Sequence, residues 1–286
     1  MPNDRTPLLP ATQPVQELPP PLRYLVRDHP IFLRACHSPW TFIPQTTLIW
    51  ARGIIVVYLT LLAPVLFNLA TNRDPASSNW SIAFDFSIIS FTLLWLYHAI
   101  VFTWANTHCR WAEIDEYDDS WRARLLRAMS PPVQRPGDRK RFWFSLFYTT
   151  TQVFALVNAL PMFREVRVVD PAGLLTFWTV NIWGVTVLVV LGEVMFLNNV
   201  KRQVPITGHV LGLAALPAAY VNWTAVGKVM TGRSPYWFLD PDVVDGLSWM
   251  VLYAAGFVAL GPLGFALLYG LIGVREKATR RGGGGT

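Results

Sequence analysis

The chain has 286 residues, a formal net charge of +6 and 15% charged residues, whereas about 25% is usual in soluble domains. Its 52% apolar residues include 13 Trp, and its basic residues flank apolar segments. This pattern favours a membrane protein over a soluble or nucleic-acid-binding one. We therefore expect membrane lipids as partners and no nucleic acid.

Six long apolar segments predict the fold class. Each spans about 18 residues or more, which as a helix is enough to cross roughly 30 Å of hydrocarbon. Six such segments cannot all be buried in a soluble domain of this size, so we expect an all-α polytopic bundle of six transmembrane helices. The segments are 53–70, 82–105, 142–163, 174–197, 206–226 and 247–274.

The basic residues predict the orientation of this bundle. With six crossings, the N-terminal tail, the second and fourth connections and the C-terminal tail share one face, which holds most of the 24 Lys and Arg residues. Positive charge accumulates on the cytosolic side, so both termini are expected in the cytosol.

The connections and tails predict the domain organisation. An amphipathic helix is expected near Trp121–Met129 within the only large loop. The predicted regions are a disordered Pro-rich cytosolic tail (1–21), a juxtamembrane segment with a surface helix (22–46), the six-helix transmembrane domain (47–274) with its cytosolic loop (107–141), and a flexible cytosolic tail (275–286).

Two short motifs bear on the location of the protein. Asp4 precedes Leu8 and Leu9 by the spacing of an acidic dileucine sorting signal, which would direct the protein to a vacuole or lysosome. A sequon at Asn79 lies so close to the second apolar segment that we do not expect glycosylation there.

The two cysteines, Cys36 and Cys109, both fall on the expected cytosolic side, where thiols stay reduced. No paired metal-ligand spacing is present. We expect no disulfide, no metal and no cofactor.

Polar side chains inside the apolar segments are the natural candidates for a site, because a charged group at the membrane centre costs roughly 2.5–3.5 kcal/mol. Such residues fall into two layers, and in the cytosolic one His98, Thr149–Thr151 and Glu193 lie at similar depth, whereas Arg52 and His209 lie closer to the surface. The cytosolic layer is either an acid/base cluster or ion path, or an Arg52–Glu193 ion pair with hydroxyls bonded to their own helices, which we favour. The cytosolic layer contains Arg52, His98, Thr149, Thr150, Thr151, Glu193 and His209, and the luminal layer contains Asp85, Ser87, Asn158, Asn181 and Thr186.

A motif joins the fifth and sixth segments: Trp, seven residues, Thr-Gly, three residues, then Tyr-x-Phe-Leu and an acid. With the six-helix pattern, it resembles the androgen-induced, FAR-17a-like family of membrane proteins. This resemblance implies a protein of the endoplasmic reticulum or another endomembrane. Some members hydrolyse fatty acid esters of hydroxy fatty acids with a membrane-embedded Thr nucleophile and a His. The motif residues are Trp223, Thr231, Gly232, Tyr236, Phe238, Leu239 and Asp240, and Asn181 and Thr186 match the family's N-x-x-x-H-T spacing.

The chain departs from this family at both catalytic positions. Val185 stands where the family has His, and Phe84 stands where it has Thr (Pro44 if Trp40 rather than Trp80 is aligned). Neither Val nor Phe can act as base or nucleophile. We therefore expect a lipid-associated membrane protein that descends from fatty-ester hydrolases and lacks their Thr–His pair.

Two alternatives remain. The first is an active lipid ester hydrolase with a rearranged site, in which Thr186 or Ser87 acts with Asp85. The second is a small transporter or channel, which the absence of an internal repeat disfavours.

Overall fold

The computed structural model describes residues 31–72, 79–110, 120–132, 139–158 and 173–281. These residues form helices and connections, and no strand occurs among them. The predicted all-α fold is therefore confirmed for this part of the chain. The tail with Asp4, Leu8 and Leu9 lies outside the described residues, as does the side chain of Asn79.

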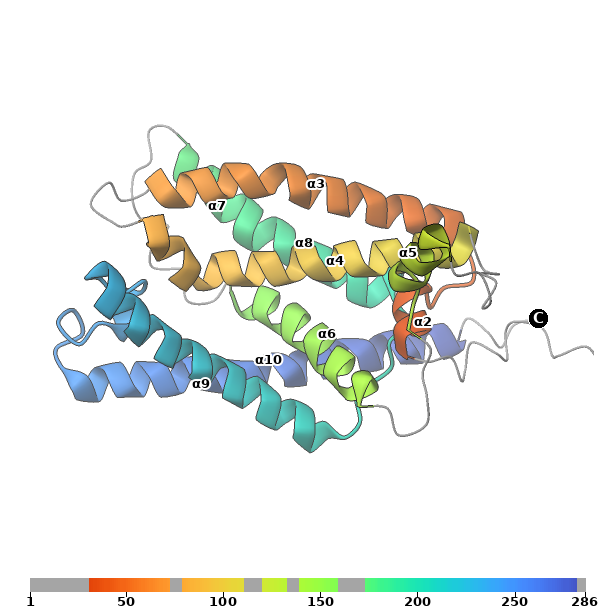
Figure 1. The fold of residues 1–286 in the computed structure, drawn as a ribbon. Helices are drawn as coiled ribbons and strands as arrows, with labels where there is room; N and C mark the ends of the chain where they lie inside the picture. Colours follow the sequence, from red (N-terminus) through yellow and green to blue (C-terminus); the bar gives the residue numbers. More distant parts are fainter. Residues whose placement is uncertain (1–30, 73–78, 111–119, 133–138, 159–172, 282–286) are drawn as a thin grey trace, which may run out of the picture.

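Long helical passes alternate in direction along one bundle axis, and short elements pack at its ends (Figure 1). The long passes are α3 (Gln45–Asn72), α4 (Phe86–Arg110), α6 (Lys140–Val157), the continuous series α7 (Leu174–Thr179), η3 (Val180–Val185), α8 (Thr186–Gly192) and η4 (Glu193–Leu197), then α9 (Ile206–Thr231) and α10 (Leu247–Arg281). The short elements are α2 (Ile31–Cys36), η1 (Asn79–Phe84), α5 (Trp121–Met129) and η5 (Trp237–Leu239).

Five helices in the described ranges are long and apolar enough to cross a membrane. The predicted segment 142–163 corresponds to α6, which has 18 residues, begins with Lys140 and Arg141, and ends at Val157. Residues 159–163, which complete this segment, lie outside the described ranges. A sixth crossing and the cytosolic placement of both termini therefore stay predictions. The five spans are Gln45–Thr71, Phe86–Arg110, Thr176–Leu197, Ile206–Thr231 and Leu247–Thr279.

The outward faces of these spans are apolar. Leu61, Leu188 and Leu211, on three different spans, are 68%, 67% and 69% exposed. In water such a surface would drive aggregation, whereas in a bilayer it is covered by lipid tails. The chain is therefore a multi-pass membrane protein.

Small residues bring the helices close together. A Cβ atom on Gly261 of α10 would lie 2.0 Å from the carbonyl oxygen of Leu213 in α9, and one on Gly264 would lie 2.7 Å from Cγ1 of Val153 in α6. Apolar burial does not drive helix association inside a bilayer, so close van der Waals packing at such positions takes its place. α10 consequently packs against both α9 and α6.

Two short helices lie at the end of the bundle where α3 begins and α10 ends (Figure 1). α5 occupies the range in which the sequence predicts an amphipathic helix. In place of a helix on the membrane surface, the described part of the juxtamembrane segment contains α2, which buries four of its six residues against α4 and α6. The ring of Phe32 anchors α2 there, because it packs against the rings of Trp104 and Phe144 at centroid distances of 5.7 and 5.2 Å.

Candidate functional site

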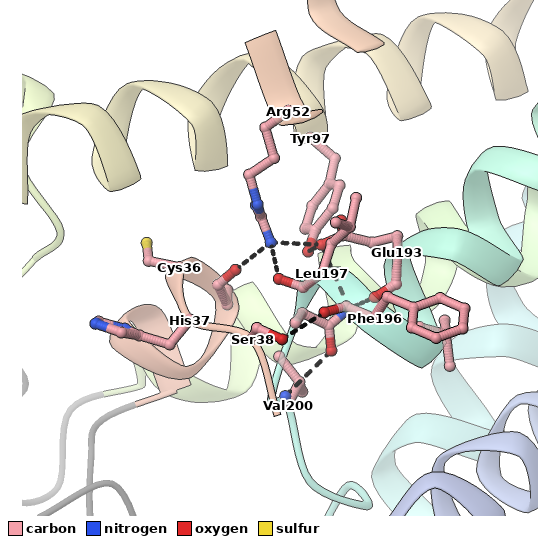
Figure 2. Close-up of polar contacts among 12 residues, drawn as sticks. Cys36, His37, Ser38, Arg52, Tyr97, Glu193, Phe196, Leu197 and Val200 are labelled. Carbon is pink, nitrogen blue, oxygen red and sulfur yellow. Dashed lines mark hydrogen bonds and ion pairs between the residues drawn. The ribbon is translucent and has the colours of Figure 1, made fainter. Parts of the chain in front are cut away.

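An ion pair inside the bundle is the centre of the cytosolic polar layer. Arg52 of α3 donates from Nη2 to Oε1 of Glu193 at 3.0 Å, and both side chains are fully buried. The same Nη2 donates to the carbonyl oxygens of Ala35 and Leu197, each at 2.6 Å (Figure 2). The predicted Arg52–Glu193 pair is therefore present, and it also joins α2 to η4.

Two neutral side chains complete the surroundings of the Glu193 carboxylate. Tyr97 of α4 donates its hydroxyl to Oε1 at 2.7 Å (Figure 2). Asn198 donates Nδ2 to Oε1 at 3.3 Å and to the backbone oxygen of Glu193 at 2.9 Å. A buried charge is tolerated only when it is paired and hydrogen-bonded, and these donors meet that requirement at Oε1, whereas Oε2 is buried without a partner among the described residues.

A second buried arginine, Arg275 of α10, donates hydrogen bonds to the same C-terminal end of η4. Its Nη1 donates to the backbone oxygens of Val194 and Asn198 at 2.7 and 2.8 Å, and to Oδ1 of Asn198 at 3.0 Å. Its Nη2 donates to the carbonyl of Val200. We call Arg52, Tyr97, Glu193, Asn198 and Arg275 together the η4 hub.

The hub satisfies a helix end that lies inside the protein. The last carbonyls of any helix lack partners within the helix, and cationic donors stabilise that end. At η4, each of these carbonyls accepts a hydrogen bond from a side chain of another segment. The pairs are Arg275 to Val194 and Asn198, Trp40 to Met195, Ser38 to Phe196, and Arg52 to Leu197.

The other members of the cytosolic layer do not join one site. His98 is fully buried beside the Tyr97 ring, and within the described ranges its two ring nitrogens have no hydrogen-bond partner. Thr149 donates to the backbone oxygen of Ser145 at 2.6 Å, as expected for a hydroxyl bonded to its own helix. The hydroxyls of Thr150 and Thr151 are buried without a partner among the described residues.

His209 belongs to a separate polar cluster between α6 and α9. Its Nε2 lies 2.7 Å from Oγ of Ser145, and its Nδ1 lies 2.9 Å from the carbonyl oxygen of Pro205. The Ser145 hydroxyl also contacts Oε1 of Gln203, and all three side chains are buried. Since a carbonyl only accepts, Nδ1 carries a proton, and the Ser145 hydroxyl is shared between Gln203 and His209.

The luminal layer forms a cap at the start of α4. The Asp85 carboxylate accepts the backbone N–H of Ser87 at 2.7 Å, as a helix N-cap does, and also accepts the hydroxyl of Tyr236 at 3.2 Å. Ser87 donates its hydroxyl to Oδ1 of Asn158 at 2.9 Å. Burial, followed by the charge of Asp85, raises the pKa of Tyr236 well above its usual value, so this phenol stays a neutral donor.

Asn181 and Thr186 lie apart from this cap. Asn181 accepts a hydrogen bond from the Tyr58 hydroxyl and donates to the carbonyl of Phe177. Thr186 donates to the carbonyl of Ile182, one turn earlier in its own pass, at 2.7 Å. Neither contacts a titratable base in the described structure, so the proposed grouping with Asp85 and Ser87 is only partly formed.

The motif between α9 and α10 builds a compact helix end. Gly232 has φ = +75° and donates its N–H to the carbonyl of Lys228, which ends α9 in the left-handed turn that glycine favours. The hydrogen bond from Lys228 at 2.8 Å lowers the pKa of Asp240. The other members pack or bond locally: Trp223 to the carbonyl of Ala83, Thr231 to that of Gly227, Tyr236 to Asp85, and Phe238 and Leu239 in the core.

Five functional candidates were not evident in the sequence: Tyr97, Ser145, Asn198, Gln203 and Arg275. Only Arg275 carried a signal, because it directly follows the last apolar segment. No group of three or more His, Cys, Asp or Glu side chains in the described ranges is placed to hold a metal ion.

Comparisons of the chain with family models, with curated proteins and with solved structures found no match. The resemblance to the androgen-induced, FAR-17a-like family therefore rests on the motif and the helix pattern alone.

Proposed function

We propose that this protein is a lipid-associated membrane protein that shares ancestry with the FAR-17a-like fatty-ester hydrolases and does not hydrolyse esters. The observation that carries the proposal is the use of Phe84 and Val185 at the two catalytic positions. Phe84 is a packing residue: its ring lies 4.9 Å from that of Trp223, and a Cβ on Gly227 would lie 2.7 Å from it. A Thr at this position would leave a cavity between η1 and α9.

The substitutes considered for these positions also have structural partners. Asp85 caps α4, Ser87 is bonded to Asn158, and Thr186 is bonded to its own pass. A nucleophile needs a base within hydrogen-bond reach, at about 2.6–3.2 Å. Asp85 accepts a bond from the backbone N–H of Ser87, not from its hydroxyl. These contacts support a structural role for the luminal layer.

A second candidate function, ester hydrolysis, is favoured by one observation. Ser145 and His209 have the separation of a nucleophile and its base, and Pro205 orients the ring. In such a reaction the Ser145 hydroxyl would add to an ester carbonyl while Nε2 of His209 took its proton. The imidazolium would then protonate the leaving alcohol, and water would hydrolyse the acyl-serine. Against this, Ser145 is only 4% exposed and is also held by Gln203.

One labelling experiment separates the two functions. The purified full-length protein in detergent micelles is treated with a fluorophosphonate probe, alongside an active membrane serine hydrolase and a heat-denatured sample of the protein. We expect no specific labelling of the native protein. Labelling that is lost in Ser145→Ala and His209→Gln but kept in Ser87→Ala would establish the hydrolase instead. Labelling lost in Ser87→Ala or Thr186→Val would assign activity to the luminal layer.

The membrane in which the protein resides forms part of the same proposal. We place it in an endomembrane, with the endoplasmic reticulum first and a vacuole or lysosome as the alternative. Imaging of a C-terminally tagged chain tests this, and relocation by Leu8→Ala with Leu9→Ala would identify the dileucine signal as active.

A further inference from the structure

We propose that a cleft beside the C-terminal part of α10 binds an anionic phospholipid. This inference rests on the lipid association proposed above and names the class of lipid. The cleft has a volume of about 590 Å³, and its lining includes Arg202, Tyr269, Gly270, Gly273, Glu276 and Lys277. It thus combines an apolar groove with two cationic side chains and one carboxylate.

The groove exists because two glycines leave the backbone of α10 uncovered. A Cβ atom on Gly270 would meet no atom within 4 Å, and one on Gly273 would meet only the Arg202 side chain, at 3.8 Å. Neither glycine is needed for close helix packing, unlike Gly261 and Gly264 on the same helix. The space beside them suits an acyl chain, which can lie against bare helix backbone.

Positive charge lies at the mouth of this groove. The guanidinium carbon of Arg202 sits 5.4 Å from the centroid of the Tyr269 ring, and its Nε donates to Oε2 of Glu276 at 3.1 Å. The other carboxylate oxygen of Glu276 accepts the backbone N–H of Arg202 at 3.1 Å. Glu276 is thereby engaged on both oxygens and holds Arg202 over the ring, while Lys277 is exposed.

These charges favour one class of headgroup. A phosphate diester complements Arg202 and Lys277, and basic pockets at helix ends commonly hold anionic headgroups. Glu276 offsets the charge of Arg202, so Lys277 gives the mouth its net positive charge. A choline group would add a further positive charge there, and the Tyr269 face that would otherwise attract it is covered by Arg202. The cleft therefore selects a lipid with net negative charge over phosphatidylcholine.

The position of the cleft along the membrane normal fits a lipid headgroup. The apolar segment 247–274 ends inside it, and Arg275, Glu276 and Lys277 follow directly. Arg275 turns inward to the η4 hub, whereas Lys277 faces outward. The boundary between apolar and charged residues on α10 marks the level of the interface, where a phosphate lies next to the first acyl carbons.

The test is a lipid titration of the purified full-length protein in detergent micelles, read by native mass spectrometry. The probes are dioleoyl phosphatidylglycerol and dioleoyl phosphatidylcholine. The wild type is expected to retain phosphatidylglycerol at lower concentration than phosphatidylcholine. Lys277→Gln should weaken phosphatidylglycerol binding about fivefold, the effect of one basic residue near an anionic headgroup. Gly273→Leu, which fills the groove, should remove the preference.

Gly256→Leu is the matched control, since a Cβ there also meets no atom within 4 Å but lies outside the cleft. It should bind as the wild type does. Equal retention of the two lipids by the wild type, or unchanged binding in both Gly273→Leu and Lys277→Gln, overturns the proposal. So does full competition by millimolar inorganic phosphate, because the site would then be a phosphate site. Should Gly273→Leu fail to fold, Gly270→Leu takes its place.

The total phospholipid that co-purifies with each variant separates failure of this inference from failure of the proposed function. Wild-type amounts of total phospholipid without a preference for phosphatidylglycerol leave the general lipid association standing and remove only the cleft. Loss of all co-purifying lipid from the wild type contradicts both.

Discussion

Arg52, Glu193 and Arg275 bring three charges into the interior of a membrane protein, and each has a reason to remain there. The two guanidinium groups supply donors to the carbonyls that η4 leaves unpaired, and the carboxylate offsets one of the two positive charges. Charged groups at such depth normally mark functional sites. Here the hydrogen bonds indicate that they hold the C-terminal end of η4 in place.

Breaking the Arg52–Glu193 pair should be costly. Arg52→Met and Glu193→Leu are each expected to lower the free energy of unfolding by about 3–5 kcal/mol, because each leaves the partner charge buried and unpaired. The double variant should lose less than the sum of the two. Denaturant titration in mixed micelles, followed by Trp fluorescence, measures these values.

The Arg202–Glu276 pair is the matched control, since its side chains are 45% and 17% exposed. Replacement of Arg202 by Met should cost only about 0–1 kcal/mol. A Glu193→Leu variant as stable as the wild type would contradict a structural role for the hub.

At the scale of elements, glycines on one helix have opposite roles. On α10, Gly261 and Gly264 face α9 and α6 and allow close packing. Gly270 and Gly273 face outward and leave the helix surface open. The third pass, α6, is the most polar of the set, and it supplies Ser145 and Thr149–Thr151 to the interior. The C-terminal end of η4 explains why the hub forms. Its last backbone carbonyls need hydrogen-bond donors from side chains of other segments.

Gly261→Ala is expected to destabilise the contact between α9 and α10. Its Cβ would lie 2.0 Å from a backbone oxygen of Leu213, so the helices must separate, at a cost at or above the usual overpacking penalty of about 1–3 kcal/mol. Gly256→Ala on the same helix has open space and should be neutral or stabilising by up to about 1 kcal/mol. Parallel thermal unfolding in micelles makes the comparison, and equal melting temperatures would show that the approach of the two helices is not tight.

For the molecule as a whole, the number of crossings decides which loops face the cytosol. Cys109 lies in the last turn of α4, and Asp242 lies in the connection between α9 and α10 with its side chain 84% exposed. If α6 crosses the membrane, these positions lie on opposite sides. If α6 does not cross, they lie on the same side.

Labelling with a membrane-impermeant maleimide tests this arrangement. In sealed microsomes we expect Cys109 of the wild type to react from the cytosolic side. Asp242→Cys, in a Cys109→Ser background, should react only after detergent is added. Cys36 should stay unlabelled in both proteins, since burial raises its pKa to about 12 and the thiolate is the reactive form. Labelling of both positions in sealed vesicles would show that α6 does not cross the membrane and that the chain has five crossings in place of six.

Local composition was enough to predict that the protein lies in a lipid bilayer and that its fold is all-α. Five of the six apolar segments correspond to helices that can span a membrane, because length and apolarity along a continuous stretch are properties of the sequence itself. The Arg52–Glu193 pair was also predictable, since two opposite charges in one polar layer of an apolar medium have few other partners. The helix at Trp121–Met129 followed from its own pattern in the same way.

Only the tertiary structure decided how these helices face one another. Ser145 and His209 are 64 positions apart, and Arg275 reaches Val194 across 81, so no local pattern reveals either contact. The rotation of each helix about its axis selects which polar groups meet, and it separated His98 from His209, although the sequence places both in one polar layer. The same rotation turned Gly270 and Gly273 away from the bundle and opened the cleft beside them. Depth in the membrane is determined by the sequence of apolar residues, whereas facing depends on packing between distant segments.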